Sequence, residues 1–340
     1  MQSRSPVADL MSESATKLLG GKYELVQPVG QGGMASVWLG LTHGEAGFRR
    51  KVAIKRVLQH LFQDQGFEAM FVEEARVVAD LNHPNIVQVH DFGYDIDGGY
   101  FIVMEWCEGM NLENYVRSYL HARERTPWQL LSAVSIEVLR ALSAAHQHTD
   151  DEGRAAPVIH RDVAPANILV GINGSVKLTD FGLSRAMDRP GTTDPGTVKG
   201  KVAYMAPECL RGSGPSLMTD IYALGVTLWE AVAGRPLFGG TGTDVEVAMR
   251  VMNGDIPPLD EVREDIPREL CQIVARATSL EPRHRYQRGG AMVEALSSLL
   301  RKQTKPTDGA EIARSVREAI RRKAPSMPPP KPRTIPGVTS

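Results

Sequence analysis

The feature that most constrains the fold is a change in the spacing of apolar residues near Gly109. Before it, five segments rich in β-branched and aromatic residues lie between turn residues and predict strands over 23–30, 35–43, 50–58, 86–94 and 100–106. A helical pattern over 66–82 interrupts them. After Gly109 helical spacing dominates, over 111–125, 127–148, 216–234, 244–254, 268–279 and 289–303. The sequence therefore predicts an α+β protein of two lobes: a small β-rich lobe with one main helix, then a larger, mainly helical lobe.

Composition excludes several classes of protein. The 340 residues suffice for two lobes, and the net charge of −1 gives no bias toward nucleic acid or a membrane surface. Three widely separated cysteines without C-x-x-C spacing favour neither disulfides nor a zinc site. The first residues lack the apolar region of a secretion signal, and no run reaches the roughly 18 apolar residues of a membrane helix. We expect a cytoplasmic protein that binds no nucleic acid and spans no membrane.

Both ends differ from the body of the chain. Residues 1–21 are polar, small and aperiodic, so we expect disorder there. Residues 301–340 hold ten Lys or Arg against three Asp or Glu, with an amphipathic helix expected over 309–323 and a Pro-rich run after it. We expect this tail to stay in solvent; the alternatives are that it folds back on the acidic body, meets an anionic partner or docks in an aromatic groove of a partner. Between these two end segments we expect the small lobe over 22–108 and the large lobe over 109–300.

Four polar motifs carry the candidate chemistry. The first is VGQGGMASVW, in which Gly30, Gln31, Gly32 and Gly33 lie between two predicted strands. Because glycine has no Cβ, such a turn lets backbone N–H groups approach phosphate oxygens closely. An ordinary hairpin turn gives the same pattern, so the motif alone is not specific.

The second motif is VAIK, where Lys55 ends an apolar strand that buries the stem of its side chain. A lysine there needs an anionic partner or a route to water. Glu74 on the predicted helix is the expected partner because it lies beside the apolar stripe, with Glu73 as the competing one. Such a pair would let Lys55 reach phosphate oxygens while charged; two exposed surface charges are the alternative.

The third and fourth motifs are HRDVAPAN, residues 160–167, and LTDFGLSR, residues 178–185. Asp162 can accept or orient the proton of an attacking hydroxyl group. Asn167 and Asp180 offer oxygen atoms, which Mg²⁺ prefers as ligands. A single loop aspartate is more often a turn or cap residue, but four motifs in this order and at these separations are far more specific.

With these motifs the sequence resembles the eukaryotic-like (Hanks-type) protein kinases, in particular bacterial Ser/Thr protein kinases, over about residues 22–300. The resemblance implies a two-lobed kinase fold with a small antiparallel N-lobe, a helical C-lobe and ATP between them. It implies Mg²⁺, or Mn²⁺ in its place, as the metal, and protein side chains as substrates.

The resemblance also assigns roles to single residues. Phosphate contacts fall to the glycine-rich turn and to Lys55 with Glu74, the catalytic base is Asp162, and the metal ligands are Asn167 and Asp180. The adenine site would consist of Val37, Ala53 and Leu169 around the ring, Met104 as the gatekeeper, and the hinge residues Glu105, Trp106 and Cys107. Structural roles fall to the pair Glu208–Arg285, to Asp220 as a ligand of the catalytic-loop backbone, and to a regulatory spine of Val78, Val89, His160 and Phe181.

The sequence departs from the family pattern at two places. Ala35 replaces the third glycine of the phosphate loop, a small change because the backbone can still donate hydrogen bonds. Ala164 stands where the family has a lysine that steadies the transferred phosphate, and Lys201 stands where Ser/Thr kinases have the threonine that pairs with it. We hypothesise that Lys201 extends into the space that Ala164 leaves; a solvent-facing Lys201 and a slower site are the alternative.

The residues present favour an active Ser/Thr protein kinase. Lys55, Asp162 and Asp180 are all retained, and Pro165 and the YMAPE segment resemble the Ser/Thr class. A catalytically weak, ATP-binding pseudokinase or scaffold is the alternative. Tyrosine kinases often have Ala where this chain has Ala164, so a tyrosine or dual-specificity kinase is a lesser alternative.

Regulation is expected through the activation segment. In the family, an arginine at the place of Arg161 receives a phosphate group, and Thr192, Thr193 and Thr197 are the candidate acceptors. A phosphothreonine adds about −1.5 to −2 charge, enough to order the segment against Arg161. A Thr-rich loop without a switch is the alternative. Upstream, His146 and His148 lack a convergent third metal ligand, so we expect them at the surface.

Overall fold

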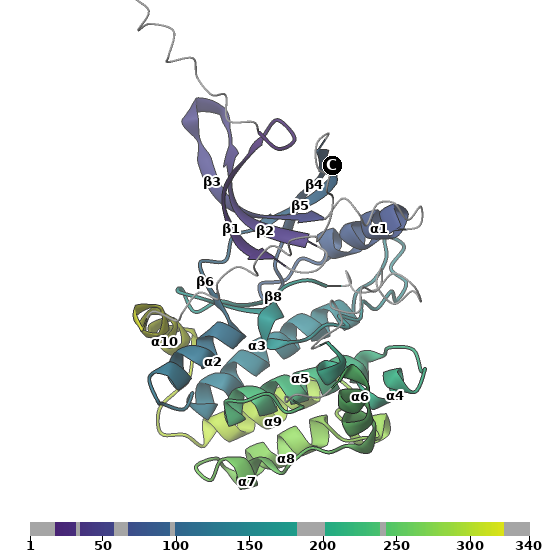
Figure 1. Ribbon diagram of the computed structural model, residues 1–340, viewed down its shortest axis with the longest axis vertical. Coiled ribbons are helices and arrows are strands. Elements are labelled where there is room, and N and C mark those ends of the chain that lie inside the picture. Colours follow the sequence, from purple (N-terminus) through teal and green to yellow (C-terminus); the bar gives the residue numbers. More distant parts are fainter. Residues whose placement is uncertain are drawn as a thin grey trace, which may run out of the picture.

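The chain forms two lobes, one built on a sheet and one built of helices, and Figure 1 shows the sheet above the helices. The computed structural model describes residues 18–31, 35–57, 67–95, 99–181, 201–238 and 243–322. The predicted α+β fold with a small antiparallel lobe and a larger helical lobe is confirmed.

The N-lobe is a five-stranded antiparallel sheet in the order β1–β2–β3–β5–β4. The strands are β1 (Tyr23–Gln31), β2 (Ala35–His43), β3 (Arg49–Val57), β4 (Val89–Asp95) and β5 (Gly99–Glu105). A one-turn 3-10 helix, η1 (Glu45–Gly47), joins β2 to β3, and α1 (Phe67–Asp80) contacts β4. All five strands and this helix lie at the predicted places.

Apolar side chains occur on both faces of this sheet, because its strands do not alternate strictly between apolar and polar residues, as the strands of a half-exposed sheet do. One cluster, next to α1, contains Val57, Ala75, Val87, Ile102 and Met104. The other contains Leu19, Tyr23, Val52, Ile54, Phe101 and Val103. Leu19 is 4% exposed, so the lobe begins before residue 22, and the expectation of disorder up to residue 21 is wrong for this residue. A buried leucine cannot belong to a solvated tail.

The C-lobe is helical and holds the largest core. The predicted helices form as α2 (Leu112–His121), α3 (Trp128–His146), α5 (Leu217–Ala233), α6 (Asp244–Asn253), α8 (Arg268–Ala277) and α9 (Gly289–Arg301). The sequence did not predict the short α4 (Pro207–Leu210), α7 (Leu259–Val262), η3 (Pro165–Asn167), η5 (Val202–Tyr204) or η6 (Pro282–His284). Among the described residues, no helix combines the length and apolarity that a membrane crossing requires.

Helix α5 lies at the centre of this core and is buried nearly all round, as expected for a helix without a polar face. Ser216 and Thr219 form a capping box at its start, and Gly234 ends it in the left-handed conformation. These two caps fix the position of the helix, and with it the position of Asp220 in its first turn.

A second, three-stranded antiparallel sheet lies where the lobes meet, in the order β6 (Gly109–Asn111), β7 (Ile168–Gly171) and β8 (Val176–Leu178). The segment before β4 is bonded to it, since the N–H of Val87 donates to the carbonyl of Leu178 at 2.9 Å and the N–H of Leu178 donates to the carbonyl of Asn85 at 2.8 Å. This sheet therefore links the end of the N-lobe to the loops that hold the polar motifs.

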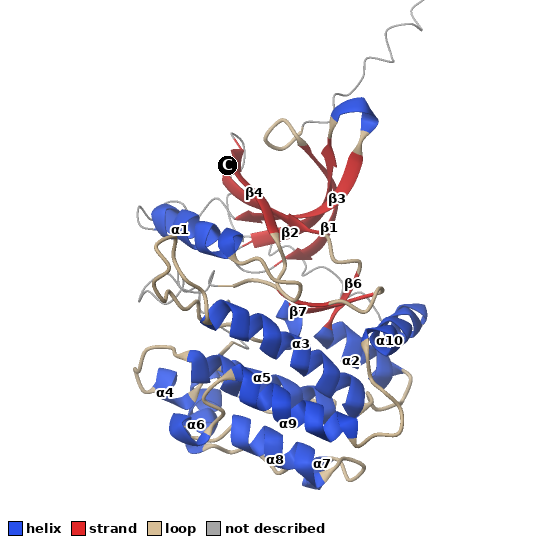
Figure 2. Cartoon of the chain, turned by 180° about the vertical axis from the view of Figure 1, so that it is seen from behind, coloured by secondary structure: helices blue, strands red, loops and turns tan. Residues whose placement is uncertain are grey.

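The tail forms one more helix, α10 (Gly309–Arg321), which contacts α2, β6 and β7 of its own chain. Figure 2 shows it beside α2 at the edge of the C-lobe. Val316 and Ala319 of α10 have no exposed surface, so its apolar face is occupied by the C-lobe and is not open to a partner's groove. The Pro-rich run that follows lies outside the described residues.

Candidate active site

A buried carboxylate anchors the HRDVAPAN loop. Asp220 of α5 is 1% exposed and accepts the backbone N–H groups of His160 and Arg161, both at 2.9 Å. Arg161 has φ +67°, a left-handed conformation that a non-glycine residue adopts at a cost of roughly 1–2 kcal/mol. The two bonds to Asp220 hold the loop in this shape, and the predicted contact of Asp220 with the loop backbone is confirmed.

The same aspartate corrects the expectation for His146. Its Nε2 lies 2.8 Å from Oδ2 of Asp220, and its side chain is only 5% exposed. A signal was present in the sequence, because Leu139 and Leu142 precede it by seven and four residues on the buried stripe of α3. His146 is therefore a buried hydrogen-bond partner of Asp220, not a surface residue.

Asp162 and Asn167 are joined through the loop backbone. The side-chain Nδ2 of Asn167 donates to the carbonyl of Asp162 at 2.8 Å, and its backbone N–H donates to the carbonyl of Ala164 at 3.0 Å. Since the amide nitrogen is used in this way, Oδ1 of Asn167 is the atom that can bind a metal. The carboxylate of Asp162 is 17% exposed, so a reactant can reach it.

His160 connects this loop to the LTDFGLSR motif. It has no exposed surface; its Nε2 lies 3.0 Å from the carbonyl of Thr179, and its Nδ1 accepts the backbone N–H of Asp162 at 3.2 Å. Both bonds require the neutral ring with the proton on Nε2. Burial lowers the pKa of His160, which agrees with this tautomer. The N–H of Thr179 also donates to the carbonyl of Asn167 at 3.0 Å, so the two motifs form one hydrogen-bonded unit.

Lys55 reaches from the N-lobe to Asp180 of the C-lobe. Its Nζ donates to Oδ1 of Asp180 at 2.7 Å, and the two side chains are 13% and 29% exposed. Burial raises the pKa of Asp180, but the charge and the hydrogen bond of Lys55 more than offset this, so the pKa lies below its ordinary value. Asp180 has φ +65°. The structure thus brings together residues that are 125 positions apart.

The register of the sheet aligns Lys55 with Val37 of the expected adenine site and with Gly30 of the glycine-rich turn. Val37 of β2 is opposite Lys55 of β3 and also opposite Gly30 of β1. Gln31 ends β1, opposite Ser36. These residues therefore form a row across three strands that ends at the glycine-rich turn. Gly32 and Gly33 lie outside the described residues.

The residues expected around adenine gather on the side of the sheet that faces α1. Ala53 of β3 is opposite Met104 of β5, which is 8% exposed, and Ala53 and Leu169 both pack against the apolar cluster that contains Met104. At the hinge, Glu105 forms an ion pair with Lys177 at 2.6 Å, which the sequence did not predict. Burial raises the pKa of the Cys107 thiol, so this cysteine stays protonated at neutral pH.

The four residues of the expected spine also lie together. The rings of His160 and Phe181 contact edge to face, with centroids 4.4 Å apart. Phe181, Val78 and Val89 line one small cavity with Met104 and Asp180. α1 and the LTDFGLSR motif are therefore packed against each other through side chains that the sequence identified.

Lys201 lies at the centre of the site. Its Nζ donates to Oδ2 of Asp162 at 2.8 Å, and its side chain is 40% exposed. Its backbone is fixed by the next residues, since the N–H of Tyr204 donates to the Lys201 carbonyl at 3.0 Å and the Tyr204 hydroxyl donates to Glu230 at 2.7 Å. The ammonium group of Lys201 is therefore bound to Asp162, although part of the side chain is exposed to solvent.

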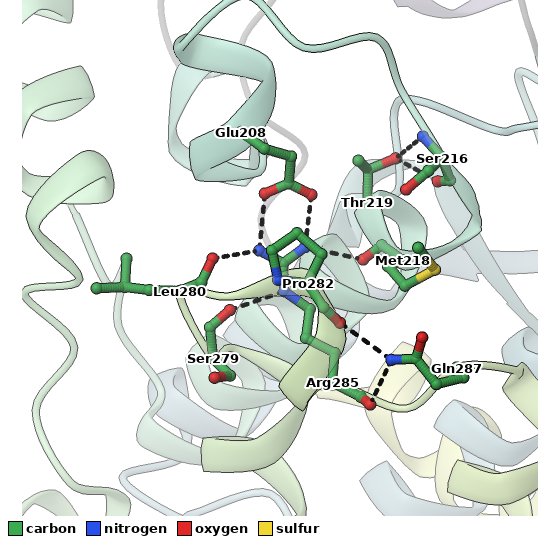
Figure 3. Close-up of polar contacts among 9 residues, drawn as sticks. All are labelled: Glu208, Ser216, Met218, Thr219, Ser279, Leu280, Pro282, Arg285 and Gln287. Atoms are coloured by element: carbon green, nitrogen blue, oxygen red, sulfur yellow. Dashed lines mark hydrogen bonds and ion pairs between the residues drawn. The ribbon is translucent and has the colours of Figure 1, made fainter.

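A buried ion pair holds the segment that follows, as Figure 3 shows. The Arg285 side chain is fully buried and binds both oxygens of Glu208, at 2.7 and 2.8 Å. Its other donors reach the carbonyls of Ser279, Met218 and Leu280, at 2.7, 3.1 and 3.1 Å. All five N–H groups of the guanidinium are therefore used, and the predicted pair of Glu208 with Arg285 is confirmed.

Some predicted residues fall outside this description. The helix α1 that carries Glu74 is described, but the Glu74 side chain is not, so its pairing with Lys55 stays a prediction. Thr192, Thr193 and Thr197 also lie outside the described residues.

The donor set fits a magnesium ion held together with phosphate groups. Among the residues that the structure describes, no three His, Cys, Asp or Glu side chains group as a metal cage. Mg²⁺ is usually held by one or two carboxylates and by substrate phosphates instead. Asp180 and Oδ1 of Asn167, which belong to the same hydrogen-bonded unit, supply such donors.

A sheet lobe, a helical lobe, and a lysine–aspartate pair between them that meets the HRDVAPAN loop together define the class of two-lobed kinase folds. This chain belongs to the protein kinase family, since residues 23–298 match the family described as "Protein kinase domain".

Relatives of different substrate classes match the chain. It is 39% identical to the tyrosine-protein kinase MasK of Myxococcus xanthus over 281 residues, and this aligned region covers 82% of this chain and 43% of MasK. It is 34% identical to the serine/threonine-protein kinase PrkC of Bacillus subtilis over 275 residues, and this aligned region covers 80% of this chain and 39% of PrkC. The chain thus spans about two fifths of the length of these curated relatives.

Solved structures agree with the fold. The kinase domain of PknI from Mycobacterium tuberculosis superposes with a TM-score of 0.61 at 26% identity, over 85% of this chain and 99% of that domain. The likeness covers both lobes, so the arrangement of the motifs follows from the common fold.

Proposed function

We propose that this chain is a protein-serine/threonine kinase that transfers the γ-phosphoryl group of ATP to hydroxyl groups of protein side chains. The observation that carries the proposal is the meeting of Lys55 with Asp180 at 2.7 Å, next to a loop in which Asn167 binds the backbone of Asp162. Residues from three distant motifs share one site, as phosphoryl transfer requires. Because ATP is a cytoplasmic substrate, we propose the cytoplasm as the place of this activity.

Each residue of the site has a role that its environment supports. Asp162, whose carboxylate is partly exposed, accepts or orients the proton of the attacking hydroxyl group. Lys55 moves between Asp180 and the α- and β-phosphates, with Glu74 as its second partner. Asn167 and Asp180 hold Mg²⁺, or Mn²⁺, which when bound neutralises the charge on the phosphate oxygens. Gly30 to Gly33 cover the phosphates with backbone N–H groups.

The nucleotide base is proposed to lie between apolar side chains from both lobes. Val37 and Ala53 cover it from the N-lobe and Leu169 from β7, with Met104 at the back. The backbone of Glu105 to Cys107 then supplies the hydrogen bonds that select adenine. Such a site is mostly apolar with a few directional polar groups, as is usual for a ligand of this size.

Tyrosine specificity is the second candidate, because MasK is named a tyrosine-protein kinase and Ala164 departs from the Ser/Thr pattern. We favour Ser/Thr specificity, since Pro165 and the YMAPE segment match that class, as does the name of PrkC. The products separate the two: purified chain is incubated with Mg-ATP and a mixed protein substrate, and phosphosites are mapped by mass spectrometry. Phosphate on tyrosine alone would overturn the Ser/Thr assignment.

The variant Asp162→Asn is the matched control for activity. It keeps the shape of the side chain and removes its charge, so the parent should yield phosphopeptides and the variant should not. If neither the parent nor the variant yields phosphopeptides, while ATP still raises the melting temperature, the chain would instead be a nucleotide-binding scaffold.

Control by phosphorylation of the activation segment is part of the proposal. Arg161 lies directly before the catalytic residue with its backbone fixed by Asp220, so its side chain can receive a phosphate without moving the loop. The acceptors are Thr192, Thr193 and Thr197. Replacing all three by alanine should reduce the rate in a chain purified after autophosphorylation. An unchanged rate, or phosphate found only outside residues 183–205, would remove this part of the proposal.

A further inference from the structure

Two changes in this chain meet at one place in the structure. Ala164 stands where the resemblance to the kinase family implies a lysine. It is 8% exposed and starts the turn that holds Asn167. Lys201 starts the 3-10 turn η5 (Val202–Tyr204) after a gap of 37 positions in the chain, and its ammonium lies 2.8 Å from Oδ2 of Asp162. The cation that is missing beside Asp162 in the sequence is thus present there in space.

The two lysines of the site bind two different carboxylates, which belong to motifs joined by the hydrogen bond from the N–H of Thr179 to the carbonyl of Asn167 at 3.0 Å. Lys55 binds Asp180 from the N-lobe, and Lys201 binds Asp162 from the C-lobe.

The backbone at Lys201 is held in place by packed and hydrogen-bonded neighbours. Its backbone begins η5, Val202 behind it is 7% exposed, and Tyr204 is tied to the buried Glu230. The side chain itself is 40% exposed. A lysine in this setting has a rigid base and a mobile, charged end, which is what contact with a moving phosphoryl group needs.

We infer that Lys201 is a catalytic residue of phosphoryl transfer, which binds an oxygen of the γ-phosphate in place of the lysine that Ala164 replaces. The inference rests on the proposed kinase function. In the step, the substrate hydroxyl oxygen forms a bond to the γ-phosphorus while the bond from that phosphorus to the β,γ-bridging oxygen breaks, and ADP leaves with the electron pair. The hydroxyl proton passes to Asp162. An ammonium has three donors, so Lys201 can hold Asp162 and a γ-oxygen at the same time.

The contact with Asp162 has an opposite interpretation that the test must separate. If Lys201 only covered the base, it would slow the reaction, and its removal would raise the rate. If it binds the γ-phosphate, its removal lowers kcat and also weakens binding of a nucleotide that has a γ-phosphate, without affecting ADP. The second pair of effects does not arise from a merely structural role.

The experiment compares Lys201→Met with Lys302→Met. The substitution is the same, and Lys302 is an exposed lysine that pairs with Glu269 on the far side of the C-lobe. Calorimetry measures the Kd of Mg-ADP and of Mg with a non-hydrolysable ATP analogue, and steady-state assays give kcat and KM. For Lys201→Met we expect kcat to fall about 10²–10³-fold and the analogue to bind about tenfold more weakly, with ADP unchanged. Lys302→Met should equal the parent in all four values.

A rescue closes the argument. The double variant Ala164→Lys with Lys201→Thr restores the usual arrangement, so it should regain most of the lost kcat and the lost affinity for the analogue. The inference is overturned if Lys201→Met keeps the parent's kcat, if it is faster, or if it weakens ADP and the analogue equally. A parent without transfer activity would refute the proposed function, whereas the ratio of the two Kd values would still test Lys201.

Discussion

Replacing Ile312 by alanine should destabilise the protein, although this residue follows the matched kinase region. Ile312 is 4% exposed on the face of α10 that packs against the C-lobe. Truncating a buried isoleucine to alanine costs about 2–5 kcal/mol from lost burial and from the cavity left behind. At about 2–4 °C per kcal/mol, typical of domains of 150–250 residues, the melting temperature should fall by several degrees.

The same helix supplies the matched control. Ile320 is 43% exposed, so Ile320→Ala makes the same change in composition and helix propensity with little loss of burial. Its cost should stay within about 0.5 kcal/mol. Urea and thermal unfolding, followed by circular dichroism on the full chain, measure both variants. Equal stabilities for Ile312→Ala and Ile320→Ala would refute the view that α10 is docked in solution.

Polar contacts make the docking specific, and truncation tests them together. The hydroxyls of Tyr115 and Tyr119 lie 2.5 and 2.6 Å from Oγ of Ser315, and Arg322 pairs with Glu124 at 2.9 Å. A chain that ends at residue 322 should keep the parent's stability. One that ends at residue 300 exposes both tyrosines and should unfold at a lower temperature. No difference between the two truncations would show that the folded unit ends before α10.

The chain that ends at residue 300 should also bind nucleotide more weakly. Arg317 of α10 donates to the carbonyl of Ile172 at 2.6 Å, and the N–H of Ile172 donates to the carbonyl of Glu108, next to the hinge, at 2.8 Å. Loss of α10 loosens this end of β7, the strand that carries Leu169. Calorimetry with Mg-ADP should give a higher Kd for the chain that ends at residue 300 than for the one that ends at 322; equal values would confine α10 to a role in stability.

Three further predictions follow from single residues. Because the folded pKa of His160 lies below the ordinary 6.5, the unfolded state binds more protons in acid, and the unfolding free energy should fall more in the parent than in His160→Phe as the pH is lowered from 7.5 to 5.5; parallel pH profiles in urea unfolding would contradict this. Arg285→Met should cost about 3–5 kcal/mol because it leaves a half-buried carboxylate without its partner, against 0–1 kcal/mol for Arg283→Met, whose side chain is 78% exposed; similar melting temperatures would count against it. Gly174→Ala should destabilise more than Gly153→Ala, since both glycines have positive φ but only the first would place a Cβ within 1.9 Å of a backbone oxygen of α10; thermal unfolding of the pair decides.

The sequence predicted the elements better than their partners. Apolar spacing located the strands and the long helices because burial of one face or stripe is a local property of the chain. The short turns η3, η5 and η6 were not predicted, since three residues carry too little periodicity. The surface expectation for His146 was wrong because it rested on the lack of a third metal ligand, whereas this residue continues the buried stripe of Leu139 and Leu142.

Contacts between distant residues were predicted only where a motif supplied them. Glu208 with Arg285 and Asp220 with the loop backbone came from the family pattern and are confirmed. The pair of Ser315 with Tyr115 had no such pattern, since an apolar helix face shows that it will be buried but not against which surface. The tail was therefore expected mainly in solvent, with folding back on the chain as an alternative, and its helix does pack on the chain's own C-lobe.

The distribution of charge explains why a chain with Ala164 needs a lysine elsewhere. Asp220 is satisfied by backbone N–H groups and His146, so it adds structure but no reactive charge at the surface. Asp162 and Asp180 remain accessible, and in the proposed reaction a triphosphate must approach both. Two unit charges about 4 Å apart interact by about 4 kcal/mol at an effective dielectric constant near 20, which corresponds to about a thousandfold in rate. Lys55 offsets this repulsion at Asp180, and without Lys201 nothing of comparable charge would be bound to Asp162 among the described residues. The size of this unbalanced repulsion agrees with the loss in kcat expected for Lys201→Met.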